Sequence, residues 1–158
     1  MHPNAVMIKQ FYEAFNRGDY STMAACYHGD ITFSDPVFLD LEGSQVSDMW
    51  EMLCRQAGSL DVTSSDIQAD DTHGSAHWCA TYLFGKQKRL VKNSIAARFD
   101  FQDGKIIRHE DQFNFWRWSR MALGPLGLVL GWHPRVKKKI SEQALRNLTG
   151  FTESKKAV

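Results

Sequence analysis

The strongest constraint on the fold is a change in the hydrophobic period near residue 60. Beyond it, apolar and polar side chains alternate, which is the two-residue period of β-strands. The pattern predicts strands over residues 61–69, 76–84, 90–101 and 106–116, separated by short polar turns of which 102–105, with its Asp-Gly pair, is the clearest. Strands joined by such hairpins form an antiparallel sheet.

The first 57 residues repeat apolar side chains at helical spacing instead. Helices are predicted from Pro3 to about residue 16, over 20–27, and from Ser44 to about residue 57, with a short strand over 30–35 between the last two. This order predicts an α+β fold, a cystatin-like roll. Its three N-terminal helices cover the concave face of a cone-shaped, curved antiparallel sheet, and the cone encloses a pocket.

Composition excludes several classes of protein. The chain has 158 residues, which suits one domain, and its formal net charge of +1 does not favour nucleic-acid binding. Three scattered cysteines indicate a reducing compartment. The N-terminus lacks a signal-peptide pattern, and no apolar run approaches the ~18 residues of a membrane span. We therefore expect a soluble, cytoplasmic protein.

Asp35 is the first candidate for chemistry. In the strand over 30–35 it shares a face with Phe33, and Pro36, which lacks an N–H, must end the strand there. A carboxyl at a rigid strand end among apolar neighbours is a place where its pKa can be raised. The alternative is an Asp-Pro turn, in which the carboxylate only caps the reversal of the chain.

Two segments, 11–19 (FYEAFNRGD) and 30–37 (DITFSDPV), together with the hairpin over 99–107, resemble the nuclear transport factor two-like superfamily. Within it, the likeness is to the ketosteroid isomerase and SnoaL-like branch, over roughly residues 4–117. The resemblance implies the cone fold and a homodimer formed through the outer face of the sheet. It also places Asp35 where ketosteroid isomerases carry their proton-shuttling carboxylate. The superfamily includes isomerases, cyclases, epoxide hydrolases and non-enzymes, so it implies no single chemistry.

The resemblance also indicates which residues would match the oxyanion hole of ketosteroid isomerases. The tyrosine of that hole would fall at Phe11 and its protonated acid at Ala97, neither of which is a donor, although Tyr12 is adjacent. Each such donor contributes on the order of 3 kcal/mol to catalysis. A steroid isomerase of the usual design is therefore not expected.

Strand parity predicts what else lines the pocket. His109 and Asp111, two residues apart on the last strand, should face the pocket with Tyr82. We predict Asp35, His109 and Asp111 as catalytic residues, with Tyr82 or Tyr12 as hydrogen-bond donor. The alternative is that His109 and Asp111 only satisfy each other or buried backbone groups. The predicted ligand-binding residues are Phe11, Tyr12, Phe15, Phe33, Trp50, Trp78, Tyr82, Ala97, Phe99 and Phe113.

Other chemistries are disfavoured by the residues present. A metal site built from Asp35, His109 and Asp111 would lack any ligand-spacing signature, and there is no dinucleotide fingerprint, so neither a metal nor another cofactor is predicted. An epoxide-hydrolase site of the Asp-Arg-Asp type would need an inward arginine, whereas Arg98 and Arg108 have outward parity.

The chain continues beyond the predicted domain, residues 1–118. A C-terminal helical extension is expected over 119–150, with a helix opening at Pro134, and a flexible polar tail over 151–158. Residues 121–132 form an apolar run flanked by arginines and lysines. The extension is expected to pack on the domain or across the pocket mouth; the alternative is contact with a membrane surface.

Taken together, the sequence predicts a protein that binds a small hydrophobic ligand or substrate. As an enzyme it would catalyse general acid–base proton transfer, of isomerase or lyase type, on a hydrophobic carbonyl compound. The alternative is a non-catalytic ligand-binding or protein-interaction module with the same fold. A homodimer is expected, and the outward parity of Leu83 and Trp116 supports it.

Overall fold

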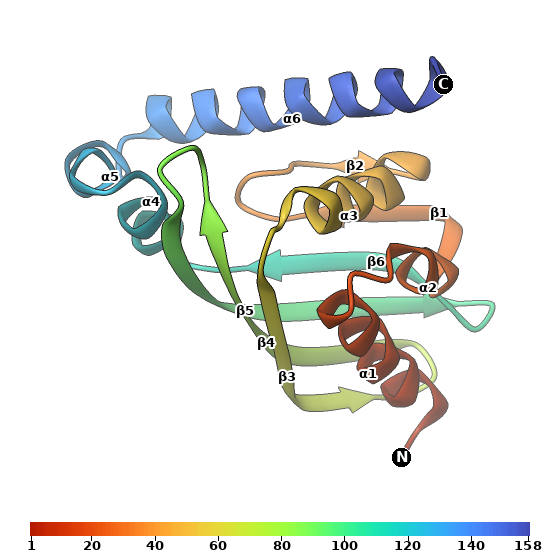
Figure 1. Cartoon of the computed structure of the whole chain (residues 1–158). Coiled ribbons are helices and arrows are strands. Elements are labelled where there is room, and N and C mark those ends of the chain that lie inside the picture. The colour runs from red at the N-terminus through yellow and green to blue at the C-terminus, as the bar shows by residue number, and fades with distance from the viewer.

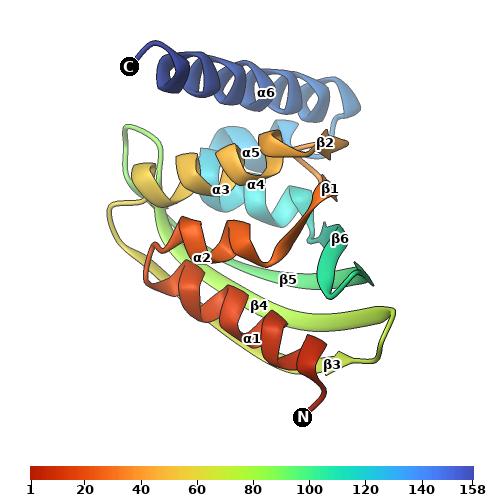
Figure 2. The ribbon, with the colours of Figure 1, turned by 90° about the vertical axis from the view of Figure 1, so that its right-hand side faces the viewer.

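The computed structural model of the protein describes residues 1–158, except for the side chain of Leu130. The helices are α1 (Pro3–Asn16), α2 (Tyr20–Ala25), α3 (Ser44–Gln56), α4 (Phe115–Leu123), α5 (Pro125–Leu130) and α6 (Pro134–Lys156). The strands are β1 (Tyr27–Ser34), β2 (Leu41–Glu42), β3 (Leu60–Ala69), β4 (His73–Phe84), β5 (Arg89–Gln102) and β6 (Lys105–Gln112). Figures 1 and 2 show α1, α2 and α3 on one side of a curved sheet, with α6 running across α3. This is the predicted α+β fold.

The sheet has the strand order β2-β1-β6-β5-β4-β3. Neighbouring strands are antiparallel except for β1 and β6, which are parallel. The pairing register shifts between Ser65 and Gln68 on β3 and between Asp100 and Phe101 on β5. Such irregularities bend a strand and increase its twist, and here they curve the sheet around the helices.

The core lies between this concave face and the helices. Ile8, Phe11 and Phe15 of α1 recur at helical spacing and are buried against the sheet. From α3, Met49 and Trp50 join the same cluster. The hydrophobic period of the sequence is therefore sufficient to orient these helices.

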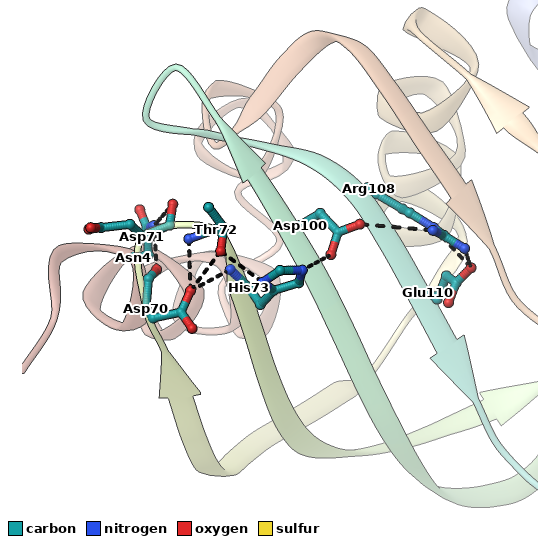
Figure 3. Close-up of polar contacts among 8 residues, drawn as sticks. All are labelled: Asn4, Asp70, Asp71, Thr72, His73, Asp100, Arg108 and Glu110. Atoms are coloured by element: carbon teal, nitrogen blue, oxygen red, sulfur yellow. Dashed lines mark hydrogen bonds and ion pairs between the residues drawn. The ribbon is translucent and has the colours of Figure 1, made fainter.

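The outer face of the sheet carries polar side chains instead. Asp100 on β5 lies 3.8 Å from His73 and 3.9 Å from Arg108, which also contacts Glu110 (Figure 3). Arg98 is exposed as well. Both arginines therefore have the outward orientation that strand parity predicts.

The predicted strand over 106–116 is too long, because β6 ends at Gln112. Asn114 accepts a hydrogen bond from the backbone N–H of Arg117 (3.0 Å) and so caps α4. Within α4, Phe115 and Trp118 lie on one buried face at helical spacing. Trp116 consequently belongs to a helix and does not support a dimer interface on the sheet.

The flexible tail predicted for 151–158 is also wrong, since α6 continues to Lys156. Leu148 is buried, and beyond it Thr152 donates a hydrogen bond to Asp48 of α3 (2.8 Å). Lys155 then forms ion pairs with Asp48 (2.9 Å) and Glu51. Polar contacts with acids on another helix order the segment, and local composition does not reveal them.

Replacing Lys155 with Met should loosen the end of α6. The change leaves Asp48 and Glu51, both largely buried, without their shared cation, and we expect a loss of about 1–2 kcal/mol in the docking free energy of the helix. Hydrogen exchange of α6 amides measures this directly. Lys156→Met, at the exposed neighbouring position, is the matched control and should leave exchange unchanged. Equal protection in both variants would contradict this view of the contact.

Candidate functional site

A cavity of about 380 Å³ lies between α3, the inner face of the sheet, α4 and α6. This volume falls in the range of small-molecule sites. Most of the wall is apolar. The polar residues in it are Asp35, Gln56, Tyr82, Asn93, Asp111, Gln143 and Asn147.

The cavity includes some of the predicted site residues and not others. Those that line it are Asp35, Asp111, Phe15, Trp50, Trp78, Tyr82 and Phe113. The remainder lie behind its wall, packed in the core: His109, Phe11, Tyr12, Phe33, Ala97 and Phe99. The cavity is thus displaced toward α4 and α6, away from the α1 end of the cone.

Asp35 follows directly on the end of β1. Its Oδ1 accepts hydrogen bonds from the backbone N–H groups of Val37 (2.7 Å) and Phe38 (2.6 Å), while its own N–H donates to the carbonyl of Phe38 (2.8 Å). Asp35 therefore does cap a turn around Pro36. The same carboxyl also lines the cavity, so Asp35 is both the cap of an Asp-Pro turn and a polar group of the pocket.

The surroundings of Asp35 favour the protonated form of its carboxyl. Burial raises its pKa, the two backbone hydrogen bonds lower it, and the charge of Asp111 raises it, leaving a pKa of about 7. A carboxyl with this pKa exchanges protons readily near neutral pH. It is suited to act as a general base or acid.

His109 is fully buried in a chain of hydrogen bonds. Trp50 Nε1 donates to the hydroxyl of Tyr27 (2.8 Å), that hydroxyl lies 2.8 Å from His109 Nδ1, and His109 Nε2 lies 2.9 Å from Asp111 Oδ1. With Nε2 protonated and Nδ1 accepting from Tyr27, every hydrogen of the chain has an acceptor. Trp78 Nε1 also donates to Asp111 (3.3 Å). His109 thus holds Asp111 in place from behind the cavity wall. The geometry is that of the alternative given above, in which the two side chains satisfy each other's hydrogen-bonding groups.

Tyr82 presents a hydroxyl to the cavity. Trp118 Nε1 donates to that hydroxyl (2.9 Å), which leaves the phenolic hydrogen free to point at a ligand. Burial, opposed by this hydrogen bond and reinforced by the charge of Asp35, raises the pKa of Tyr82. The phenol therefore stays protonated at neutral pH and is a hydrogen-bond donor within the electrostatic reach of Asp35.

The positions matched to an oxyanion hole do not supply donors. Phe11 packs edge-on against the ring of His109, with 5.6 Å between centroids. The hydroxyl of Tyr12 is buried and has no hydrogen-bond partner among the described residues. Ala97 lies directly across the strand pair from Asp111. The Asp111 carboxyl of β6 therefore lies beside Ala97, the position of β5 matched to the protonated acid of the oxyanion hole.

Cationic side chains are missing from the cavity wall as far as the structure describes it. Arg98 and Arg108 lie on the outer face, so the Asp-Arg-Asp arrangement is not formed. Within the described residues, no group of three or more His, Cys, Asp or Glu side chains is placed to hold a metal ion. Asp35, His109 and Asp111 therefore do not form such a cluster.

Several residues of the site were missed by the sequence reasoning. Asn93 shares strand parity with Ile95, so alternation could have found it. Trp118 lies on α4, beyond the end of β6, so the alternating pattern of the strands carries no signal for it. From α6, the residues that close the cavity are Ile140, Gln143, Ala144 and Asn147. Ser141 fixes this helix to the Asp35 turn by donating to the carbonyl of Val37 (2.6 Å).

Comparison with known families and structures places the fold. Residues 8–109 match the model of the SnoaL-like domain. No curated protein matches the chain. None of the helices described is long and apolar enough to cross a membrane.

Solved structures share the fold at low sequence identity. An LEH-like epoxide hydrolase of M. tuberculosis has a TM-score of 0.65 at 18% identity, covering 81% of this chain and 96% of that one. A protein classed as a SnoaL-like polyketide cyclase, from Jannaschia sp. CCS1, has a TM-score of 0.68 at 10% identity, covering 78% and 93%. TerC, co-crystallised with polyporic acid, has a TM-score of 0.67 at 14% identity, covering 78% and 100%.

Proposed function

Because the chain belongs to the SnoaL-like family, we propose that it binds a small apolar molecule in the cavity and catalyses proton transfer on it through Asp35. The observation that carries this proposal is the position of the Asp35 carboxyl in the wall of a mostly apolar cavity, where burial raises its pKa to about 7. TerC, which has the same fold, was co-crystallised with polyporic acid, and this supports a small-molecule ligand.

The proposed reaction is an isomerase-like or lyase-like proton transfer. The Asp35 carboxylate removes a proton from a carbon next to a carbonyl group, and the electron pair of that C–H bond moves toward the carbonyl oxygen. Tyr82 donates a hydrogen bond to this oxygen as its negative charge grows. The protonated Asp35 then returns the proton to another carbon or to a leaving group. Asp111, held by His109 and Trp78, provides the second polar contact for the ligand.

A second candidate is a ligand-binding or protein-interaction module without catalysis. It is favoured by the absence of donors at Phe11 and Ala97 and by the hydrogen bonding of His109 and Asp111 to each other. The two functions separate in Asp35→Asn, which should greatly lower turnover of a carbonyl substrate at unchanged affinity if the protein is an enzyme. If it is a binder, only affinity or stability should change.

Filling the cavity should weaken ligand binding under either function. Ala144 lies on α6 and faces the cavity, so Ala144→Trp should weaken binding of an apolar aromatic ketone by on the order of tenfold or more. Calorimetric titration measures the affinity. Leu145→Trp, which adds the same ring at the exposed neighbouring position, is the control and should bind normally. Unchanged affinity in a folded Ala144→Trp protein would place the ligand elsewhere.

We also propose a homodimer formed through the outer face of the sheet, as the family resemblance implies. Leu83 and Leu90 support this, since they are exposed and directly paired on β4 and β5.

A further inference from the structure

Charge is distributed unevenly along the chain. Residues 113–141 contain six of the 19 lysines and arginines and none of the 18 aspartates and glutamates. The rest of the chain therefore has 13 of these cations against 18 acids, so a cationic segment is joined to an acidic remainder. The six cations are Arg117, Arg120, Arg135, Lys137, Lys138 and Lys139.

The same segment exposes a set of large apolar side chains on α5 and the turn that follows it. Leu126, Leu128, Val129 and Trp132, which we call the α5 ridge, have between 49% and 69% of their surface exposed. An apolar set of this size on the surface of a monomer usually marks an interaction site.

Close packing of glycines turns the α5 ridge outward. A Cβ atom at Gly127 would lie 2.0 Å from the carbonyl oxygen of Ser119 on α4, and one at Gly131 would lie 1.9 Å from the Ser119 hydroxyl. Only glycine fits at these two positions, so α5 rests on α4 through Gly127 and Gly131, and the α5 ridge points away from the protein. The exposure is therefore imposed by the fold.

The cations around the α5 ridge have no acidic partner in the fold; Arg120 and Lys137 contact the rings of Trp116 (4.7 Å) and Phe115 (5.6 Å), and these rings do not neutralise their charge. All six are exposed, and none forms a salt bridge within the described part of the chain. Arg135, Lys137 and Lys138 lie in the first turns of α6, where the helix dipole disfavours positive charge. Their placement costs some helix stability, which indicates that they serve an external anion.

We propose that the α5 ridge inserts into the interfacial layer of a membrane that contains anionic lipids, with the surrounding cations on the headgroups. A lipid surface offers both halves of the complement, acyl chains for the ridge and phosphate groups for the cations. A second copy of the chain does not fit, because a two-fold interface would place the cations of one copy against the same cations of the other. A nucleic acid would leave the leucines and Val129 without an apolar partner. The contact is peripheral, since none of the helices described can span a bilayer.

Co-sedimentation with vesicles tests this proposal. The full chain should bind vesicles of phosphatidylcholine mixed with phosphatidylglycerol and should not bind vesicles of phosphatidylcholine alone. Two variants should each lower the bound fraction on the order of tenfold or more. One replaces the four residues of the α5 ridge with Ser, and the other is the triple variant Arg135→Glu, Lys138→Glu, Lys139→Glu. Because acids near a helix N-terminus stabilise it, the triple variant should fold at least as well as the wild type.

Two control variants make the result specific to this surface. Leu39→Ser combined with Leu145→Ser removes exposed apolar side chains outside both the α5 ridge and the proposed dimer face. Lys9→Glu, Lys86→Glu and Lys156→Glu together change the net charge as much as the triple variant does, at exposed positions elsewhere. Both controls should still bind. The proposal is wrong if the wild type fails to bind anionic vesicles, if the controls lose binding as the two variants do, or if the ridge variant instead abolishes self-association in a protein that ignores vesicles.

Discussion

Asp35→Asn should lower the rate of proton transfer on the order of 10³-fold. The amide is nearly the same shape, and its oxygen can still accept from the N–H groups of Val37 and Phe38, so the turn is kept while the base is lost. A suitable probe is nitrobenzisoxazole, a small apolar compound. Removal of its ring proton by a carboxylate breaks the N–O bond and gives a coloured nitrile phenolate. The initial rate of colour formation is the measurement.

The pH profile of the wild type provides an independent check. Only the ionised carboxylate accepts a proton, so the rate should rise with pH and level off above a pKa of about 7. A wild type that binds the probe, shows no rate above that of acetate at equal concentration, and differs from Asp35→Asn only in affinity would favour the non-catalytic module.

The same substitution should raise stability at high pH. The pKa of Asp35 is raised from an ordinary value of 3.8 to about 7 by folding, so the folded state holds this proton more tightly than the unfolded state does. The wild type therefore loses stability as pH rises between these two values, by on the order of 1.4 kcal/mol per unit of pKa difference. Asp35→Asn removes the loss. Its free energy of unfolding should exceed that of the wild type by a few kcal/mol above pH 7 and match it more closely near pH 4.

His109→Ala should have the largest effect on stability, about 3–5 kcal/mol in the free energy of unfolding. The substitution leaves a hole among packed rings and deprives both the Tyr27 hydroxyl and the Asp111 carboxylate of a buried partner. Urea denaturation followed by circular dichroism measures the loss. It is a large fraction of the stability of a typical domain.

His109→Gln separates the hydrogen bond from the packing. The glutamine amide nitrogen can take the place of Nε2 and donate to Asp111, so this variant should recover part of the lost stability. A loss below about 1 kcal/mol in His109→Ala would contradict the inferred chain of hydrogen bonds.

Much of the fold follows from the sequence because periodicity reports which face of an element is buried. Alternation places Trp78, Tyr82 and Asp111 on the inner face of the sheet, and helical spacing places Phe15 and Trp50 against it. The position of Asp35 at the end of β1 is equally local, since Pro36 cannot continue the strand.

One error has a local cause: β6 ends early because Asn114 caps α4, through a hydrogen bond to a residue only three positions on. The other errors arose where contacts between distant segments decide the structure. The order of residues 151–156 depends on Asp48 and Glu51, more than 100 residues earlier. The location of the cavity depends in turn on α6, held at one end by Ser141 and along its length by Leu148. The helical spacing of the sequence predicts the apolar face of α6, but it does not predict which surface of the protein that face covers.

The central claim is that Asp35 is an acid with a raised pKa inside an apolar cavity, and a carboxyl ¹³C NMR titration measures this directly. Aspartate-labelled wild type and Asp35→Asn, compared across pH, identify the Asp35 resonance. The account predicts that it titrates with a pKa of about 7. A midpoint near the ordinary aspartate value of about 4 would contradict it.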